Sequence, residues 1–140
     1  MRTSASRSSR VVALALGAVT SLAVLSGTAA AAGMDAPYAP YARAAAKVSG
    51  TGSVLASKNV AAVSRGTGTS QAGVYCVRVS DSNFDLSSAA VLATLNNSRG
   101  GITAIGSPHG YCGNATDTIT VVTSDSSGNS ADRPFTVAVL

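Results

Sequence analysis

The sequence predicts an all-β protein, built as a single antiparallel β-sandwich of jelly-roll or immunoglobulin-like type and preceded by a cleavable signal peptide. Short runs rich in β-branched residues recur at intervals of roughly ten residues, with turn residues between them. After the N-terminal segment, the sequence contains no amphipathic pattern as long as a normal helix. The only two cysteines, Cys76 and Cys112, are typical of a disulfide in an exported β-domain.

The N-terminal segment has the composition of a secretory signal peptide. Three arginines precede an apolar run at residues 11–25, and a tract of small residues follows, with cleavage sites after Ala31 or Ala32. The apolar run is shorter than the roughly 20 residues of a membrane-spanning helix. We therefore expect a secreted, extracellular protein without a membrane association after cleavage. The chain is divided into signal peptide 1–32, flexible lead-in 33–40 and β-sandwich domain 41–140.

The net charge of the secreted part is close to zero. The full sequence carries ten Lys and Arg against six Asp, a formal net charge of +4, and three of the arginines belong to the signal peptide. The basic side chains that remain are scattered singly along the chain. A nucleic-acid-binding domain typically carries a clustered basic stripe, so we expect no nucleic-acid partner.

Cys76 and Cys112 are expected to form an intramolecular disulfide. The secreted part has no tryptophan and few aromatic residues, so its core is built mainly from Val, Ile, Leu and Ala. Closing a loop of this length contributes about 4 kcal/mol in the chain-entropy model, a large share of the stability of a small domain. Two free thiols or an intermolecular bridge are the alternatives.

The first part of the domain contains short and partly ambiguous segments. The alanines at residues 41–48 suit either a short helix or a strand, and we favour a strand because isolated helices of this length are marginal in water. Residues 49–53 have turn chemistry, and the apolar runs at 54–55 and 60–63 indicate two short strands around a polar turn. A Gly-rich loop at residues 65–71 leads to the next strand.

Residues 73–79 are expected to form the central strand of the domain. Side chains alternate here with the period of two that is typical of a half-buried strand. The predicted core face holds Tyr75, Val77 and Val79, and the opposite face holds Val74, Cys76 and Arg78.

A polar connection follows the central strand. Residues 81–88 are rich in Ser and Asp, which favour turns. Phe84 and Leu86 are the large apolar side chains of this connection, and we expect them to anchor it against the core.

Residues 89–105 are predicted to form a hairpin. The strand at 89–95 has one apolar face, and the residues at 96–101 tolerate the positive φ of a tight turn. Residues 102–105 would return as the hairpin partner. The inward face of the first strand is formed by Val91, Ala93 and Leu95.

The C-terminal third has the clearest strand pattern. Residues 118–123 are mostly β-branched, and residues 124–132 favour turns. Residues 134–139 alternate again. We predict a closing hairpin with a long tip, in which the inward side chains of the second strand are Phe135, Val137 and Val139.

Two stretches form a longer pattern, Gly73-Val74-Tyr75-Cys76-Val77 and Thr123-x-Asp125-x-x-Gly128-x-x-x-Asp132-x-x-Phe135-x-Val137-x-Val139. This pattern resembles one in small secreted actinobacterial proteins that have no assigned function. The resemblance covers residues 41–140 and rests on strand and turn positions, so it implies a secreted β-domain and no activity. Related domains often place the second cysteine nearer the first or at the C-terminus, whereas here it is Cys112.

The residues from which a thiol enzyme or a zinc site would be assembled are few. A nucleophilic cysteine needs a base, and the single histidine, His109, lies in a Pro-Gly loop without the sequence pattern of a catalytic dyad. A structural zinc site generally takes four Cys or His ligands, and the chain offers three such residues, of which His109 and Cys112 could form half of a site shared between subunits. We therefore expect a structural disulfide, a surface histidine, no catalytic residue and no cofactor.

The acidic side chains of the domain lie in predicted turns or strand ends. Residues 125–132 place carboxylate and hydroxyl oxygens around a glycine, but they lack the spacing and the closing Glu of a calcium loop, so we interpret them as a solvated tip. Asp is favoured in turns for its turn chemistry alone, and no spaced carboxylate pair of a glycosidase is evident. The N-glycosylation patterns at Asn96 and Asn114 indicate exposed turns. The aspartates concerned are Asp81, Asp85, Asp117, Asp125 and Asp132.

The function that the sequence favours is that of a secreted, non-enzymatic β-domain acting as an extracellular recognition module or as a structural, envelope-associated module. Its partner would be an unknown extracellular protein or a cell-envelope component, and a Val-rich sheet face also suits homo-oligomerisation. The alternative is a small secreted hydrolase, or an inhibitor of one, that acts through loops 106–113 and 124–132, because exported β-scaffolds carry function on their loops.

Overall fold

The computed structural model describes residues 36–66, 71–81 and 83–140. Within them the chain forms eight β-strands and the short 3-10 helix η2 (Gly110–Cys112), which confirms the predicted all-β class. The signal peptide predicted at residues 1–32 lies outside the described residues, as do residues 33–35 of the predicted lead-in. No helix of the described part is long and apolar enough to cross a membrane.

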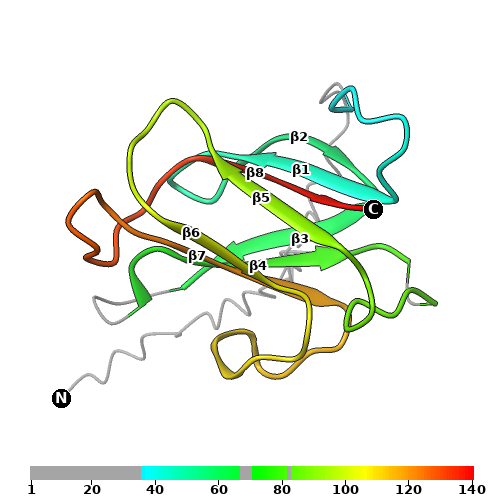
Figure 1. Cartoon of the computed structure of the whole chain (residues 1–140). Helices are drawn as coiled ribbons and strands as arrows, with labels where there is room; N and C mark the ends of the chain where they lie inside the picture. The colour runs from blue at the N-terminus through cyan, green and yellow to red at the C-terminus, as the bar shows by residue number, and fades with distance from the viewer. Residues whose placement is uncertain (1–35, 67–70, 82) are drawn as a thin grey trace, which may run out of the picture. The chain divides into compact units, whose positions relative to one another are not determined.

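The strands are arranged in two four-stranded antiparallel sheets (Figure 1). The first sheet has the order β2-β1-β8-β5 and the second has the order β3-β4-β7-β6. The first strand of the chain and the last one pair in the centre of the first sheet. In chain order the strands are β1 (Ala44–Val48), β2 (Val54–Lys58), β3 (Val60–Arg65), β4 (Val74–Val79), β5 (Val91–Leu95), β6 (Ile102–Ile105), β7 (Thr118–Thr123) and β8 (Phe135–Val139).

The ambiguous segment at residues 41–48 contains a strand, β1, and the two short strands predicted after it are β2 and β3. Only Asn59 separates these two, with a φ of 52°, in the left-handed region that Asn tolerates. Because β2 pairs with β1 and β3 pairs with β4, this residue carries the chain from the first sheet to the second.

β4 lies inside the second sheet, as predicted for the central strand. It pairs with β3 on one side and with β7 on the other. Tyr75, Val77 and Val79 face inward and are buried, whereas Arg78 on the opposite face is exposed. The period of two in the sequence therefore predicted both the strand and its core face.

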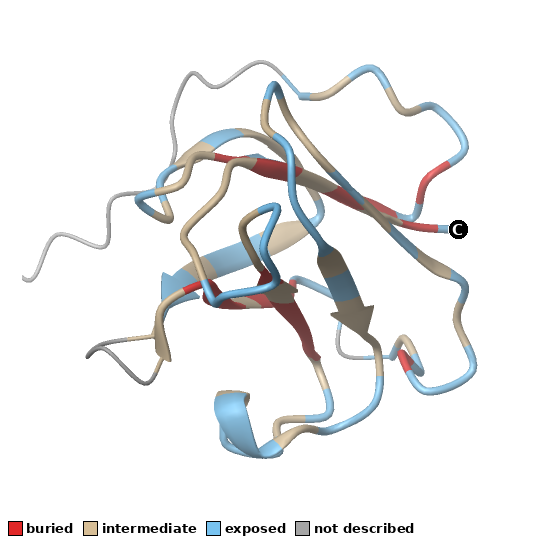
Figure 2. Cartoon of the chain, turned by 60° about the vertical axis from the view of Figure 1, so that its left-hand side comes forward, coloured by how far each residue is buried: buried red, intermediate tan, exposed pale blue. Residues whose placement is uncertain are grey.

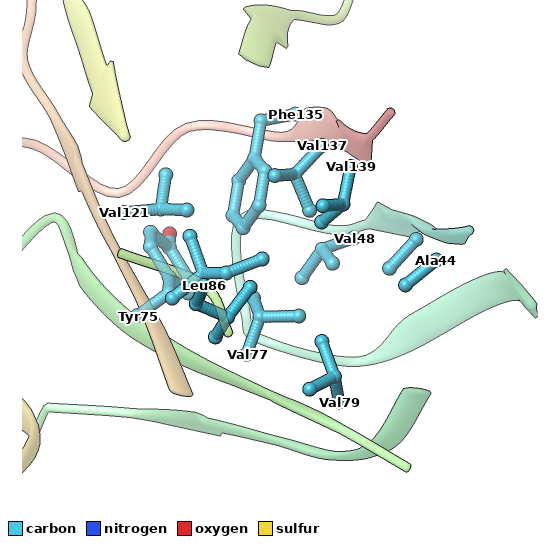
Figure 3. Close-up of a cluster of buried hydrophobic side chains, with 12 residues drawn as sticks. Ala44, Val48, Tyr75, Val77, Val79, Leu86, Val121, Phe135, Val137 and Val139 are labelled. Carbon is cyan, nitrogen blue, oxygen red and sulfur yellow. The ribbon is translucent and has the colours of Figure 1, made fainter. Parts of the chain in front are cut away.

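The core lies between the inner faces of the two sheets (Figure 3). Phe135, Val137 and Val139 of β8 meet the inner side chains of β4, and the ring of Phe135 packs edge-on against Tyr75 with centroids 4.9 Å apart. Leu86 reaches the same core from the loop after β4 and is 1% exposed, which confirms the predicted anchor. Because both sheets supply the core, the arrangement is sandwich-like.

The hairpin predicted for residues 89–105 is wrong. Both of its segments are strands, β5 and β6, but they belong to different sheets. The backbone N–H of Asn96 donates to the carbonyl of Pro134, beside β8, at 2.8 Å. At the other end of the connection, the N–H of Ser124, beside β7, donates to the carbonyl of Gly101 at 2.9 Å. These bonds hold the two ends of the connection on different sheets.

The closing hairpin predicted for residues 118–139 is also wrong, because β7 belongs to the second sheet and β8 to the first. A smaller hairpin forms at the tip, where Ser124 and Ser130 pair as an isolated bridge. The hydroxyl of Thr123 then donates to the carbonyl of Ala131 at 2.7 Å. After this tip the chain crosses to the other sheet.

The described residues of the lead-in, 36–40, contain no strand. The Lys58 ammonium donates to the carbonyls of Ala39 and Pro40 at 3.1 and 3.3 Å, which holds this segment against the end of β2. Tyr38 is 99% exposed and contributes nothing to the core.

Candidate binding surface

The predicted disulfide between Cys76 and Cys112 is present, with 5.6 Å between the two Cα atoms. Cys76 lies on the face of β4 that points away from the core, and Cys112 ends η2. The bond therefore fastens the loop between β6 and β7 onto the outer face of the second sheet. Neither cysteine is a free thiol, so neither supplies the thiolate that a thiol enzyme needs.

Thr120 shows how closely this loop covers the sheet. It pairs with Cys76 across β4 and β7, on the outer face, yet its side chain is fully buried. η2 packs against both of these strands. The Thr120 hydroxyl has no hydrogen-bond partner among the described residues. The loop is thus a fixed part of the surface.

His109 and Tyr111 form a ring pair on this loop, in which Tyr111 is exposed and His109 is half-buried. Figure 2 shows the short helix of the loop at the surface. His109 caps η2: its Nδ1 accepts the backbone N–H of Tyr111 at 3.3 Å. The two rings lie 4.8 Å apart at an angle of 56°, and Tyr111 is 52% exposed. The cap fixes the histidine ring, so the pair presents a defined aromatic surface to solvent.

A hollow of about 270 Å³ lies beside the start of β7. We call it the loop hollow, and it brings together two loops that are distant in the sequence. The loop after β4 contributes three side chains, and the residues just before β7 contribute two. They are Asn83, Phe84 and Asp85, and Thr116 and Asp117. His109 is not among them, so this hollow does not combine the histidine with a carboxylate.

Hydrogen bonds fix both aspartates of the loop hollow. The Oδ1 atom of Asp85 accepts the hydroxyl and the backbone N–H of Ser87, at 2.7 and 3.0 Å. The Oδ1 atom of Asp117 accepts the hydroxyl of Thr118 at 3.0 Å, and its backbone carbonyl accepts the N–H of Val79 at 2.9 Å. The bonds from Ser87, first its hydroxyl and then its N–H, lower the pKa of Asp85, so this carboxylate stays ionised.

Phe84 connects the loop hollow to the rest of the molecule. Its ring packs against the core, as predicted, and the guanidinium of Arg43 lies 4.2 Å from the ring centroid. The same guanidinium pairs with Asp81 at 3.5 Å. This cation–π contact and ion pair hold the loop after β4 in place, although exposed contacts of this kind contribute only about 0.5–1 kcal/mol each.

Asp85 is poorly suited to act as a general acid. A general acid near neutral pH needs a raised pKa, and that of Asp85 is lowered. In the described part of the chain, no three His, Cys, Asp or Glu side chains gather where they could hold a metal ion.

Asp125 organises the tip after β7, the segment whose sequence is partly similar to a calcium-binding loop. Its Oδ1 accepts the backbone N–H groups of Ser127 and Asn129, both at 2.9 Å, and its Oδ2 accepts the Asn129 amide at 3.2 Å. Both carboxylate oxygens are therefore used within the tip, as in an Asx turn.

The two N-glycosylation patterns differ in their surroundings. The amide of Asn96 exchanges hydrogen bonds with the Thr136 hydroxyl at 3.0 and 3.1 Å. Asn114 is exposed in a turn with a φ of 55°. Only the second therefore matches the exposed turn that both patterns were expected to indicate.

The sequence predicts that Asp85 and Asp117 lie in turns or at strand ends, but it does not indicate that they lie close together. They are 32 positions apart, and neither stretch carries a motif. Their proximity follows from the bond between Val79 and Asp117, which places the loop after β4 beside the residues before β7. Comparisons with models of known families, with curated proteins and with solved structures find no match to this chain.

Proposed function

We propose that this chain is a secreted, non-enzymatic β-domain that acts as an extracellular recognition module or a structural module of the cell envelope. The observation that carries the proposal is the ring pair of His109 and Tyr111, displayed on a loop that the disulfide fastens to the second sheet. A fixed aromatic pair with one exposed ring loses little conformational freedom on binding, which favours recognition.

Several features support secretion and a recognition role. The disulfide is compatible with an oxidising, extracellular environment. The N-terminal sequence resembles a signal peptide, with cleavage after Ala31 or Ala32. Two stacked sheets of four strands are the kind of scaffold on which jelly-roll and immunoglobulin-like domains carry recognition loops, and we propose a fold of that type.

The test uses the tagged chain from residue 33 onwards, incubated with culture medium and with isolated cell-wall fractions. We expect a bound component to be retained by the native chain and lost in Tyr111→Ala, since Tyr111 is exposed and leaves the core intact. Tyr38→Ala is the control, because it removes another exposed tyrosine from a different part of the surface. Equal capture by both variants would exclude the ring pair as the recognition element.

The alternative is a hydrolase, or a hydrolase inhibitor, that acts through loops 106–113 and 124–132. It predicts turnover of a component of the same fractions, or inhibition of a hydrolase present in them. Light scattering on the purified chain tests homo-oligomerisation through a sheet face, and the mass of a single chain would argue against it.

A further inference from the structure

We propose that the loop hollow binds an organic ammonium group, such as the side chain of a lysine. The proposal rests on the recognition role proposed above and names the chemical class of ligand that one part of the surface takes. The hollow is formed by Asn83, Phe84, Asp85, Thr116 and Asp117.

Charge complementarity favours an ammonium ligand. Two carboxylates line the hollow, and the ion pairs of the described residues involve other aspartates, Asp81 and Asp132. Among the described residues, hydrogen bonds reach Oδ1 of Asp85 and of Asp117 and leave Oδ2 of each without a protein donor. An ionised carboxylate only accepts hydrogen bonds, and an ammonium group only donates them, so the two are complementary.

The size of the hollow also favours an organic group. A volume of about 270 Å³ is far larger than a bare metal ion requires, and no third metal-ligating side chain joins the two aspartates in the described residues. It is close to the lower end of small-ligand pockets and has room for methylene groups behind a charged head. Phe84 supplies an apolar wall for such a stem.

The side chains of the hollow are held in place before a ligand arrives. Ser87 orients Asp85, Thr118 orients Asp117, and Arg43 with the core positions Phe84. A site whose groups are already ordered loses less conformational entropy on binding.

The experiment is a titration followed by amide NMR on the ¹⁵N-labelled chain from residue 33 onwards. The probe is Nα-acetyl-lysine methylamide, and the control probe is the norleucine analogue, which keeps the methylene stem and lacks the ammonium. We expect saturable shifts at Asn83, Asp85, Thr116 and Asp117 with the lysine probe alone. The dissociation constant should be on the order of millimolar, because exposed ion pairs contribute little.

Charge variants give the second arm of the experiment. Asp85→Asn and Asp117→Asn keep the Oδ1 acceptors for Ser87 and Thr118, so the turns are preserved while one charge is lost. Each should weaken binding of the lysine probe about two- to fivefold. Asp125→Asn removes the same charge at the tip that follows the far end of β7, and it should leave binding unchanged.

Three results would overturn the inference. They are equal shifts with the norleucine analogue, equal weakening by Asp125→Asn, and saturable binding of a neutral sugar such as N-acetylglucosamine in place of the lysine probe. If the lysine probe fails while capture that depends on Tyr111 persists, this inference falls and the proposed function stands. If capture does not depend on Tyr111 but the lysine probe binds, the loop hollow remains an ammonium-binding site, and the recognition role proposed for the ring pair falls.

Discussion

The hydroxyl of Tyr75 lies 3.5 Å from Oδ1 of Asp132, which is 57 positions further along the chain. The same Oδ1 accepts the backbone N–H of Gly73 at 2.7 Å, and Oδ2 pairs with the guanidinium of Arg65. One carboxylate therefore ties the crossover between β7 and β8 to the start of β4 and the end of β3. Gly73 has a φ of 75°, and a Cβ there would meet the carbonyl of Thr123, so only glycine suits this junction.

Asp132→Ala should lower the free energy of unfolding by about 2–3 kcal/mol, because it removes a part-buried ion pair and leaves the Gly73 N–H without its acceptor. Urea denaturation measures the loss. The matched control is Asp81→Ala, which removes the exposed ion pair with Arg43 and should cost less than about 1 kcal/mol. Equal losses in the two variants would mean that Asp132 is no more than another surface charge.

Tyr75→Phe tests the polar end of the same junction through pH. The Tyr75 hydroxyl donates to the carbonyl of Gly50 at 2.7 Å, and burial, followed by the charge of Asp132, raises the pKa of Tyr75 to about 12. In the unfolded chain tyrosine ionises near pH 10. The pKa of Tyr75 is higher in the folded chain than in the unfolded one. The protonated Tyr75 hydroxyl therefore contributes stability that is complete below pH 10 and is lost as the pH rises to about 12.

The measurement is the free energy of unfolding of the native chain and of Tyr75→Phe between pH 9 and 12. Other basic groups titrate in this range in both proteins, so the difference between the two isolates Tyr75. The gap should narrow as the pH rises above about 10. A gap that stays constant would mean that the hydroxyl ionises in the folded state as it does in the unfolded one.

Cys76→Ser should lower the melting temperature by on the order of 10–20 °C in oxidising buffer, because the 36-residue loop is no longer closed. Cys112→Ser should have the same effect, and the double variant should lose no more than either single one, since all three remove one bond. Reduction of the native protein should lower its melting temperature by a similar amount. A double variant clearly less stable than both single ones would show that each sulfur contributes separately.

Alternation along β4 and the apolar character of Leu86 were sufficient to predict where these residues lie. Both signals are local: a period of two assigns an inner face, and a large apolar side chain in a polar loop points to the core. The disulfide was predictable in a similar way, because a chain with two cysteines and a predicted export signal offers one intramolecular pairing.

The sheet to which each strand belongs was not predictable from these signals. The connection at residues 96–101 is suited both to a hairpin and to a crossover. Bonds to Pro134 and Ser124, more than twenty positions away, decide the outcome. The loop hollow escaped prediction for the same reason, since Asp85 and Asp117 meet only once the loop after β4 is packed against the start of β7.

The tip after β7 is not expected to bind calcium. A calcium ion takes six to eight oxygen ligands, and the Asp125 carboxylate is already occupied by donors from Ser127 and Asn129. Binding would break these bonds, and the tip has no second carboxylate on the opposite side, because Asp132 pairs with Arg65.

Millimolar calcium should therefore leave the melting temperature unchanged, and a chelator should have no effect. A calcium-dependent rise in the native chain that is absent from Asp125→Asn would show that the ion does displace the tip's own donors.

The bonds from Asn129, first its backbone N–H and then its amide, lower the pKa of Asp125, so they should contribute stability above pH 4 that is lost as the pH falls through the lowered value. Asp125→Asn lacks this ionisation, and its stability should change less than that of the native chain between pH 5 and pH 2.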